Sequence, residues 1–184
     1  MKHFKNHRTL YFAIGSTFVF FLYLIFALVP FSSCFRLDIG SNSLGLSFSY
    51  TKDMVQNFFE SRTEDQLICY SQFLQIWDVI FSILSTIMCG SWTIYLFKNK
   101  WPFLIAPTIL VMTADWSENY IELLMIGSYL NSNTISEILV SLGSGINSLK
   151  FVMIGLTYLI ILTGIIITLK VFLTNLIFRK KTPQ

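Results

Sequence analysis

Long apolar stretches separated by short polar segments form the main pattern along this chain. Four stretches are mostly apolar and close to 20 residues or longer: 9–31, 73–97, 101–127 and 151–169. A helix of about 20 residues crosses a hydrocarbon core about 30 Å thick. The pattern therefore predicts an all-α fold, an integral membrane four-helix bundle that forms one membrane domain over residues 1–184. The longest connection, 32–72, is too short to bury a core of its own.

The first connection contains signals for short helices. Thr51 can cap a helix whose apolar side carries Met54, Val55, Phe58 and Phe59. Residues 61–64 (Ser-Arg-Thr-Glu) fit a capping box for a helix that runs into the second stretch. We expect an amphipathic helix over the outer mouth of the bundle, either as a lid that fills space or as a gate over a pocket.

The second long connection shows the same kind of signal. Residues 134–137 (Thr-Ile-Ser-Glu) fit another capping box. The pattern predicts a short amphipathic helix after it, ending near Gly143 or Gly145, before the fourth stretch begins.

Basic residues lie on one side of the predicted membrane. The segments at the chain ends and between the second and third stretches contain Lys2, Lys5, Arg8, Lys98, Lys100, Arg179, Lys180 and Lys181. Residues 127–149 contain no Lys or Arg, and in the loop 32–72 acidic residues outnumber basic ones. The positive-inside rule therefore predicts that both termini are cytoplasmic and that both larger connections lie outside.

Composition agrees with this class of protein. Hydrophobic residues make up 54% of the chain and charged residues only 12%, about half of the usual globular share. The formal net charge is +3, and the basic residues are too scattered to indicate a nucleic-acid partner. The expected partner is the lipid bilayer.

The stretch 101–127 differs from the others because it contains three carboxylates. On a helix with about 100° per residue, Asp115, Glu118, Asn119 and Glu122 fall on one face. A charged side chain at the bilayer centre costs roughly 2.5–3.5 kcal/mol. Counted from the inner end of the stretch, Asp115 is expected about 21 Å into the membrane and Glu122 about 32 Å, near the outer surface.

Two further charged residues are expected at the same level. Asp78 lies near the outer end of the second stretch, and Lys150 precedes the fourth. In this layer of three helices the acids outnumber the cations, so an acid must be protonated, meet water or bind something cationic. We therefore predict a site for a small lipid-like or amine ligand in the outer half of the bundle. The predicted ligand-binding residues are Asp115, Glu118, Asn119, Asp78, Lys150, Glu122 and Trp116.

Other functions could use the same residues. A protonated and an ionised acid together perform acid–base chemistry, so a lipid-modifying enzyme with paired carboxylates is one alternative. A proton- or cation-coupled transporter is another, and a purely structural membrane subunit is a third. No catalytic residue and no cofactor is assigned. His3 and His7 are expected on the cytoplasmic side, so no metal site is predicted.

Two cysteines flank the first loop. Cys34 follows the first stretch and Cys69 precedes the second. If the outer side is oxidising, they can form a disulfide that ties down the loop.

The N-terminus also resembles a signal peptide, and residues 31–34 (Phe-Ser-Ser-Cys) loosely resemble a bacterial lipobox. An uncleaved helix is favoured because the apolar stretch exceeds the roughly 7–15 residues of a signal peptide.

The segment Asp115-Trp-Ser-Glu118-Asn119 resembles a D-x-x-E-N motif in the third span of small, largely bacterial four-span proteins without assigned function. This resemblance implies a bacterial plasma membrane and no particular activity. Four spans, a helical first outer loop and a basic tail also look like the emopamil-binding/sigma-2-receptor (EXPERA) group. That group implies an apolar cavity with intramembrane acids, here Asp78 and Asp115, that binds sterol-like or amine ligands. Its catalytic histidine and glutamates do not align with this sequence, so isomerase activity is not implied.

Overall fold

The computed structural model describes residues 2–37, 43–98 and 101–179, with side chains described between residues 7 and 174 of those ranges. The described residues are helical and contain no strand. The elements in chain order are α1 (Lys2–Tyr23), the π-helix η1 (Leu24–Leu28), α2 (Val29–Ser32), the 3₁₀-helix η2 (Leu44–Leu46), α3 (Lys52–Glu60), α4 (Glu64–Gln72), the π-helix η3 (Phe73–Trp77), α5 (Asp78–Phe97), the 3₁₀-helix η4 (Pro102–Ile105), α6 (Ala106–Ser132) and α7 (Glu137–Arg179).

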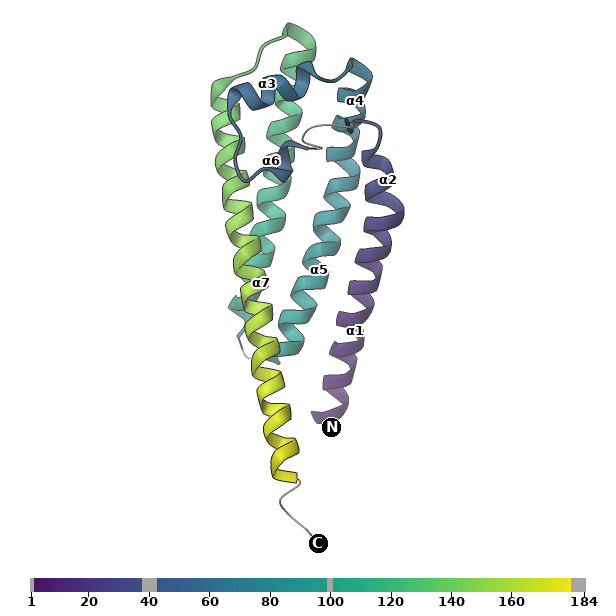
Figure 1. Cartoon of the computed structure of the whole chain (residues 1–184), viewed down its shortest axis with the longest axis vertical. Helices are drawn as coiled ribbons and strands as arrows, with labels where there is room; N and C mark the ends of the chain where they lie inside the picture. Colours follow the sequence, from purple (N-terminus) through teal and green to yellow (C-terminus); the bar gives the residue numbers. More distant parts are fainter. Residues whose placement is uncertain (1, 38–42, 99–100, 180–184) are drawn as a thin grey trace.

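The long helices α1, α5, α6 and α7 run side by side along the long axis of the molecule (Figure 1). α5 is central, because it packs against α1, α6 and α7, while α6 and α7 also pack extensively on each other. α1 and α7 make little direct contact. The first turn of α1 and the last turn of α7 lie at one end, and α3 and α4 lie at the opposite end, called the loop end below (Figure 1).

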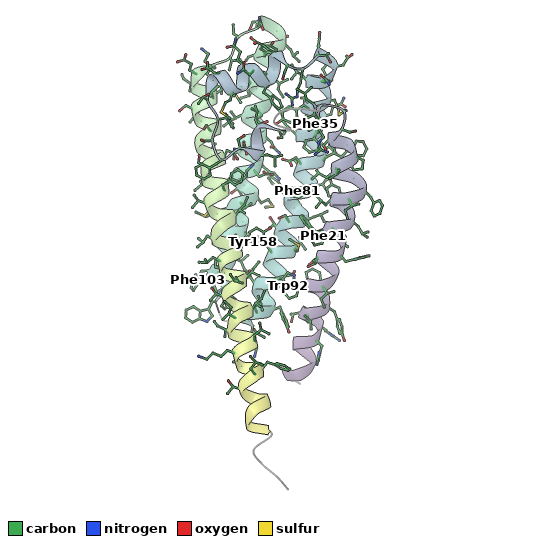
Figure 2. The ribbon with its side chains drawn as sticks, viewed as in Figure 1. Phe21, Phe35, Phe81, Trp92, Phe103 and Tyr158 are labelled. Carbon is green, nitrogen blue, oxygen red and sulfur yellow. A yellow bond between two sulfur atoms is a disulfide. The ribbon has the colours of Figure 1, made fainter. Side chains whose placement is uncertain are left out.

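Three helical segments of the described chain are long and apolar enough to cross a membrane: His7–Ser32, Glu64–Phe97 and Glu137–Thr174. They include the predicted first, second and fourth stretches, so the all-helical fold and these three candidate spans are confirmed. The third predicted stretch corresponds to η4 and α6, in which Asp115, Glu118 and Glu122 interrupt the apolar sequence. Large apolar side chains such as Phe21 and Phe103 are exposed on the outside of the helices (Figure 2).

The buried core is concentrated at the loop end and not along the apolar spans. One cluster contains three residues of α3 (Val55, Phe58 and Phe59), together with Tyr70 of α4 and Met125 of α6. Thr51 caps α3 by accepting a hydrogen bond from the Met54 backbone N–H at 3.3 Å. α3 contacts α7 and crosses the loop end of the bundle (Figure 1), so the first connection covers that end with packed apolar side chains.

Two local predictions about helix starts and ends were wrong. The capping box before α4 is formed by Thr63 and Gln66, not by residues 61–64. Ser61 instead donates its hydroxyl to the Phe58 carbonyl at the end of α3. The helix after residue 136 does not end near Gly143 or Gly145, because α7 continues from Glu137 without a break. A glycine inside a helix costs only about 1 kcal/mol relative to alanine, so a long helix can continue through Gly143 and Gly145.

The start of the first connection is held by a disulfide and a buried arginine. Cys34 and Cys69 are joined by a disulfide, with their Cα atoms 6.3 Å apart. The Arg62 guanidinium donates to the carbonyl oxygens of Phe35 at 2.9 Å and Phe58 at 2.8 Å. Phe35 is buried at the loop end (Figure 2) and contacts Tyr70 in a tilted arrangement, with ring centroids 4.7 Å apart. These contacts fix the chain where it leaves α2.

Candidate functional site

Lys150 is the centre of a buried ionic cluster between α6 and α7. Its Nζ forms an ion pair with Asp115 Oδ1 at 3.2 Å and a second ion pair with Glu118 Oε2. It also donates to the Gly45 carbonyl oxygen at 3.3 Å. All three charged side chains are buried. One ammonium group therefore bridges two carboxylates that the three-residue spacing of Asp115 and Glu118 places side by side on α6.

Asp78 and Asn119 connect α5 to α6 in the same layer. The Asn119 amide donates to Asp78 Oδ2 at 2.9 Å and to the Leu74 carbonyl oxygen at 3.3 Å. Leu74 belongs to the π-helix η3. The backbone hydrogen bonds of a π-helix differ from those of an α-helix, and here the Leu74 carbonyl accepts a side-chain hydrogen bond as well. Asp78 thus has an amide partner, whereas Asp115 has an ammonium partner, and the two acids differ in electrostatic environment.

Glu122 is fully buried, contrary to the depth estimate that placed it near the outer surface. The Tyr70 hydroxyl donates to Glu122 Oε2. The Tyr70 oxygen also accepts from the Leu44 backbone N–H at 3.3 Å and pairs with the Ser43 hydroxyl at 3.0 Å. The helix α6 continues to Ser132, five residues beyond the predicted end at 127, and the first connection folds back over this turn and removes it from solvent.

Residues 43–50, called the strap below, are bound along α7 by side-chain-to-backbone hydrogen bonds. The Tyr50 N–H donates to Ser144 Oγ at 3.0 Å, and the Ser148 hydroxyl donates to the Phe48 carbonyl at 3.0 Å. The Asn147 amide donates to the Ser47 carbonyl. Together with the bond from Lys150 to Gly45, these contacts follow successive turns of α7 and hold the strap over the ionic cluster.

The strap passes close to the ionic cluster at Gly45. A Cβ atom at this position would lie at contact distance from the cluster, 3.4 Å from Lys150 Nζ and 3.5 Å from Glu118 Oε1. Tyr50 closes the other end, and burial followed by the charges of Glu122 and Glu118 raises the pKa of its phenol. Tyr50 therefore stays protonated and remains a hydrogen-bond donor beside two acids.

Several buried oxygen atoms in this layer have no hydrogen-bond partner among the described residues. They are Asp115 Oδ2, Glu118 Oε1, Glu122 Oε1, Asn147 Oδ1 and the Tyr50 hydroxyl. Four of these five atoms are pure acceptors, so the layer lacks donors. Buried acceptors need protons, water or a bound donor group, and this shortage agrees with the surplus of acids expected from the sequence.

A cavity of about 400 Å³ lies between α1, α5, α6 and α7 and reaches the ionic layer at its loop end. Phe81 of α5 and Tyr158 of α7 are among its walls (Figure 2). Its lining is mainly apolar; the charged groups lie toward the loop end, and hydroxyl groups such as those of Thr86, Thr108 and Thr157 lie deeper. The lining residues are Phe20, Leu24, Leu28, Val29, Ser32, Arg36, Ser43, Gly45, Leu46, Phe73, Leu74, Asp78, Phe81, Ser82, Ser85, Thr86, Cys89, Thr108, Val111, Asp115, Asn119, Lys150, Phe151, Ile154, Thr157 and Tyr158.

The structure separates the predicted site residues into two groups. Asp78, Asp115, Asn119 and Lys150 line the cavity; Glu118, Glu122 and Trp116 do not. Glu118 and Glu122 lie behind the cavity wall with an exposed fraction of 0%. Trp116 lies on the outer face of α6 and donates from Nε1 to Ser82 Oγ at 2.7 Å. Trp116 is therefore hydrogen-bonded to Ser82, a residue of the cavity wall, without lining the cavity itself.

Sequence reasoning did not assign Tyr70, the strap or Arg36 to the site. Tyr70 precedes Asp78 by eight residues, so a helix places both on one face, and that spacing is a signal in the sequence. The strap had no comparable signal, because its contacts with α7 join residues about 100 positions apart in the chain.

A glycine-to-alanine pair on α7 tests the packing of the strap. A Cβ at Gly143 would overlap the Tyr50 hydroxyl, whereas a Cβ at Gly155 meets nothing within 4 Å. Gly143→Ala is expected to lower the free energy of unfolding by about 1–3 kcal/mol through overpacking. Gly155→Ala should raise it by up to about 1 kcal/mol, because alanine favours helix. Unfolding in mixed micelles measures both, and equal stabilisation of both variants would contradict this packing.

The described residues contain no group of three or more His, Cys, Asp or Glu side chains arranged to hold a metal ion. Comparison with protein-family models, with curated proteins and with solved structures finds no match to this chain. The chemistry of the site is therefore inferred from its own geometry.

Proposed function

We propose that this chain is a four-helix integral membrane protein that binds a lipid-like amphipathic molecule in the cavity beside the ionic layer. In this proposal both termini are cytoplasmic and the loop end faces outward. The positive-inside distribution supports the orientation, and the first turn of α1 and the last turn of α7 lie at the same end of the bundle (Figure 1).

The inward direction of the acids on α6 supports its assignment as the third span. Asp115, Glu118 and Glu122 are buried against α7, the strap and α4, while Ile109, Leu110 and other apolar side chains of α6 are exposed. Acids within membrane spans are found facing the bundle interior with a partner. α6 can therefore lie in a bilayer without exposing a charged side chain to lipid.

The polarity of the cavity carries the functional proposal. A volume of about 400 Å³ falls within the range of roughly 300–1,000 Å³ for small-molecule sites. The apolar walls fit a hydrocarbon body, and the loop end presents Asp78, Asp115 and Asn119. Asp115 Oδ2 has no partner among the described residues. A ligand hydroxyl, amide N–H or amine would supply the donor that this oxygen lacks.

A lipid-modifying enzyme is the second candidate, favoured by one observation. Asp78 and Asp115 line the same cavity but have different partners, an amide for Asp78 and an ammonium group for Asp115. Environments of this kind hold one carboxyl protonated and the other ionised, as acid–base catalysis requires. A new product from bound lipid, seen by mass spectrometry with wild type and lost in Asp78→Asn, would assign this activity.

Filling the cavity tests the binding proposal. Val111→Trp places a large ring in the cavity and is expected to weaken binding of monopalmitoylglycerol by about tenfold or more. Leu110→Trp is the matched control, because the neighbouring Leu110 is exposed on the outside of α6. Binding of isotope-labelled monopalmitoylglycerol to purified protein in nanodiscs gives the measurement. Equal affinity of wild type and both variants would contradict binding in this cavity.

A further inference from the structure

The cavity is not fully enclosed, and α1 and α7, which both line it, make little contact with each other. Residues of both helices line it, and two lining residues at its edge are more than half exposed: Tyr158 of α7 at 55% and Leu46 of the strap at 70%. Tyr158 lies near the middle of the apolar segment Glu137–Thr174. An opening at that depth faces hydrocarbon and not water, so a bilayer lipid can enter sideways.

Arg36 provides a cation at the loop end of this opening. It is exposed and lines the cavity. The ion pairs of the described residues involve Lys52 and Lys150, and none involves Arg36. The disulfide places Cys34 beside Cys69, which precedes Asp78 by nine residues along a continuous helical segment. At about 1.5 Å per residue, Cys69 is about 13 Å nearer the loop end than Asp78.

The charged groups of the cavity lie toward its loop end. Arg36 lies at the loop end, Asp78, Asp115 and Asn119 follow, and the wall continues along α5 with Phe81, Ser82, Ser85, Thr86 and Cys89. Cys89 is eleven residues beyond Asp78 on α5, a distance of about 16 Å along the helix. A guanidinium group binds phosphate oxygens in a bidentate manner. The carboxylates require hydrogen-bond donors, and the mainly apolar lining of the whole cavity fits an alkyl chain.

We propose that the ligand is a single-chain phospholipid from the outer leaflet, with its phosphate at Arg36, a linker hydroxyl at Asp78 and Asp115, and its chain along α5. This proposal rests on the binding function proposed above and specifies its ligand. The hydroxyl gives Asp115 Oδ2 a donor, and the phosphate gives Arg36 an anionic partner. The volume of about 400 Å³ suits one chain and a small linker.

A matched set of lipids tests this ligand class on the full chain in nanodiscs. Palmitoyl lysophosphatidate carries the phosphate and a free hydroxyl, monopalmitoylglycerol lacks the phosphate, and hexadecylamine replaces both with an amine. Wild type is expected to bind lysophosphatidate about tenfold or more tightly than monopalmitoylglycerol. A charge-assisted hydrogen bond between Arg36 and the phosphate gives a difference in affinity of about this size. Arg36→Gln should remove this difference, while Lys52→Gln, at a cation of the loop end that does not line the cavity, should preserve it.

The outcomes separate the two proposals. Equal affinity of wild type for lysophosphatidate and monopalmitoylglycerol would overturn the phosphate assignment and leave lipid binding intact. Preferential binding of hexadecylamine, strengthened in Arg36→Gln, would overturn it in favour of a cationic ligand. If the lipids bind but Val111→Trp has no effect on any of them, the cavity itself is refuted as the site. Thermal unfolding of each variant checks that the substitutions leave the fold intact.

Discussion

Lys150→Met is expected to lower the free energy of unfolding by about 3–5 kcal/mol, the usual cost of removing one partner from a buried ion pair. Lys150 is the ammonium partner of both Asp115 and Glu118, and all three side chains are buried. The methionine retains most of the apolar volume of lysine. The expected loss therefore comes from the two carboxylates, which would be left without a cation in a medium of low polarity.

Two further sets of variants make this prediction specific. Lys52 forms an exposed ion pair with Glu137 at 2.9 Å, so Lys52→Met should cost less than about 1 kcal/mol. Adding Asp115→Asn and Glu118→Gln to Lys150→Met should restore part of the lost stability, because neutral side chains no longer need the ammonium group. Equilibrium unfolding in mixed micelles gives these free energies. A cost for Lys150→Met as small as that for Lys52→Met would contradict the buried cluster.

Removal of the disulfide with Cys34→Ser and Cys69→Ser is expected to cost about 4 kcal/mol. The bond closes a loop between residues separated by 35 positions, and the chain-entropy relation for a loop of that length gives this value. The loss arises mainly in the unfolded chain, which gains conformational freedom. In the folded protein the bond also keeps Phe35 and Arg36 beside α4, so the double variant should bind lysophosphatidate less tightly.

Reducing agent provides the control for the disulfide. It should destabilise wild type by about the same amount as the double substitution and have no effect on the double variant, in which the free thiol is Cys89. Equal unfolding free energies for oxidised and reduced wild type would contradict a stabilising bond. Cys34 is exposed and Cys69 half-buried, so a soluble reductant can reach the bond in the folded protein.

The positions of the helices could be predicted well because they depend on local properties. The length of an apolar stretch and the residues that flank it determine where a membrane helix can form, and three such segments are present. Thr51 was identified correctly as a cap because capping involves neighbours in sequence. The prediction of a short helix that ends near Gly143 or Gly145 was wrong because both glycines lie inside the continuous helix α7, where Gly143 packs against Tyr50.

The candidate site could be predicted only in part. The residue spacing placed Asp115, Glu118, Asn119 and Glu122 on one face, and the structure gives all four buried positions on α6. Their different partners were not predictable, because Lys150, Tyr70 and Asp78 come from other helices. The sequence offered Arg36 as a second outer-side cation near the acids, beside Lys150, but did not identify it as a residue of the cavity wall.

The sequence by itself determined the all-helical class, the three apolar spans and the shortage of cations around the acids of the third long helix. Those properties follow from composition and from the 3.6-residue period of a helix. Only the tertiary structure decided which acids line the cavity and which lie behind it under the strap. That division depends on hydrogen bonds and ion pairs between segments far apart in the chain, such as Lys150 with Gly45, and local sequence does not specify such pairs.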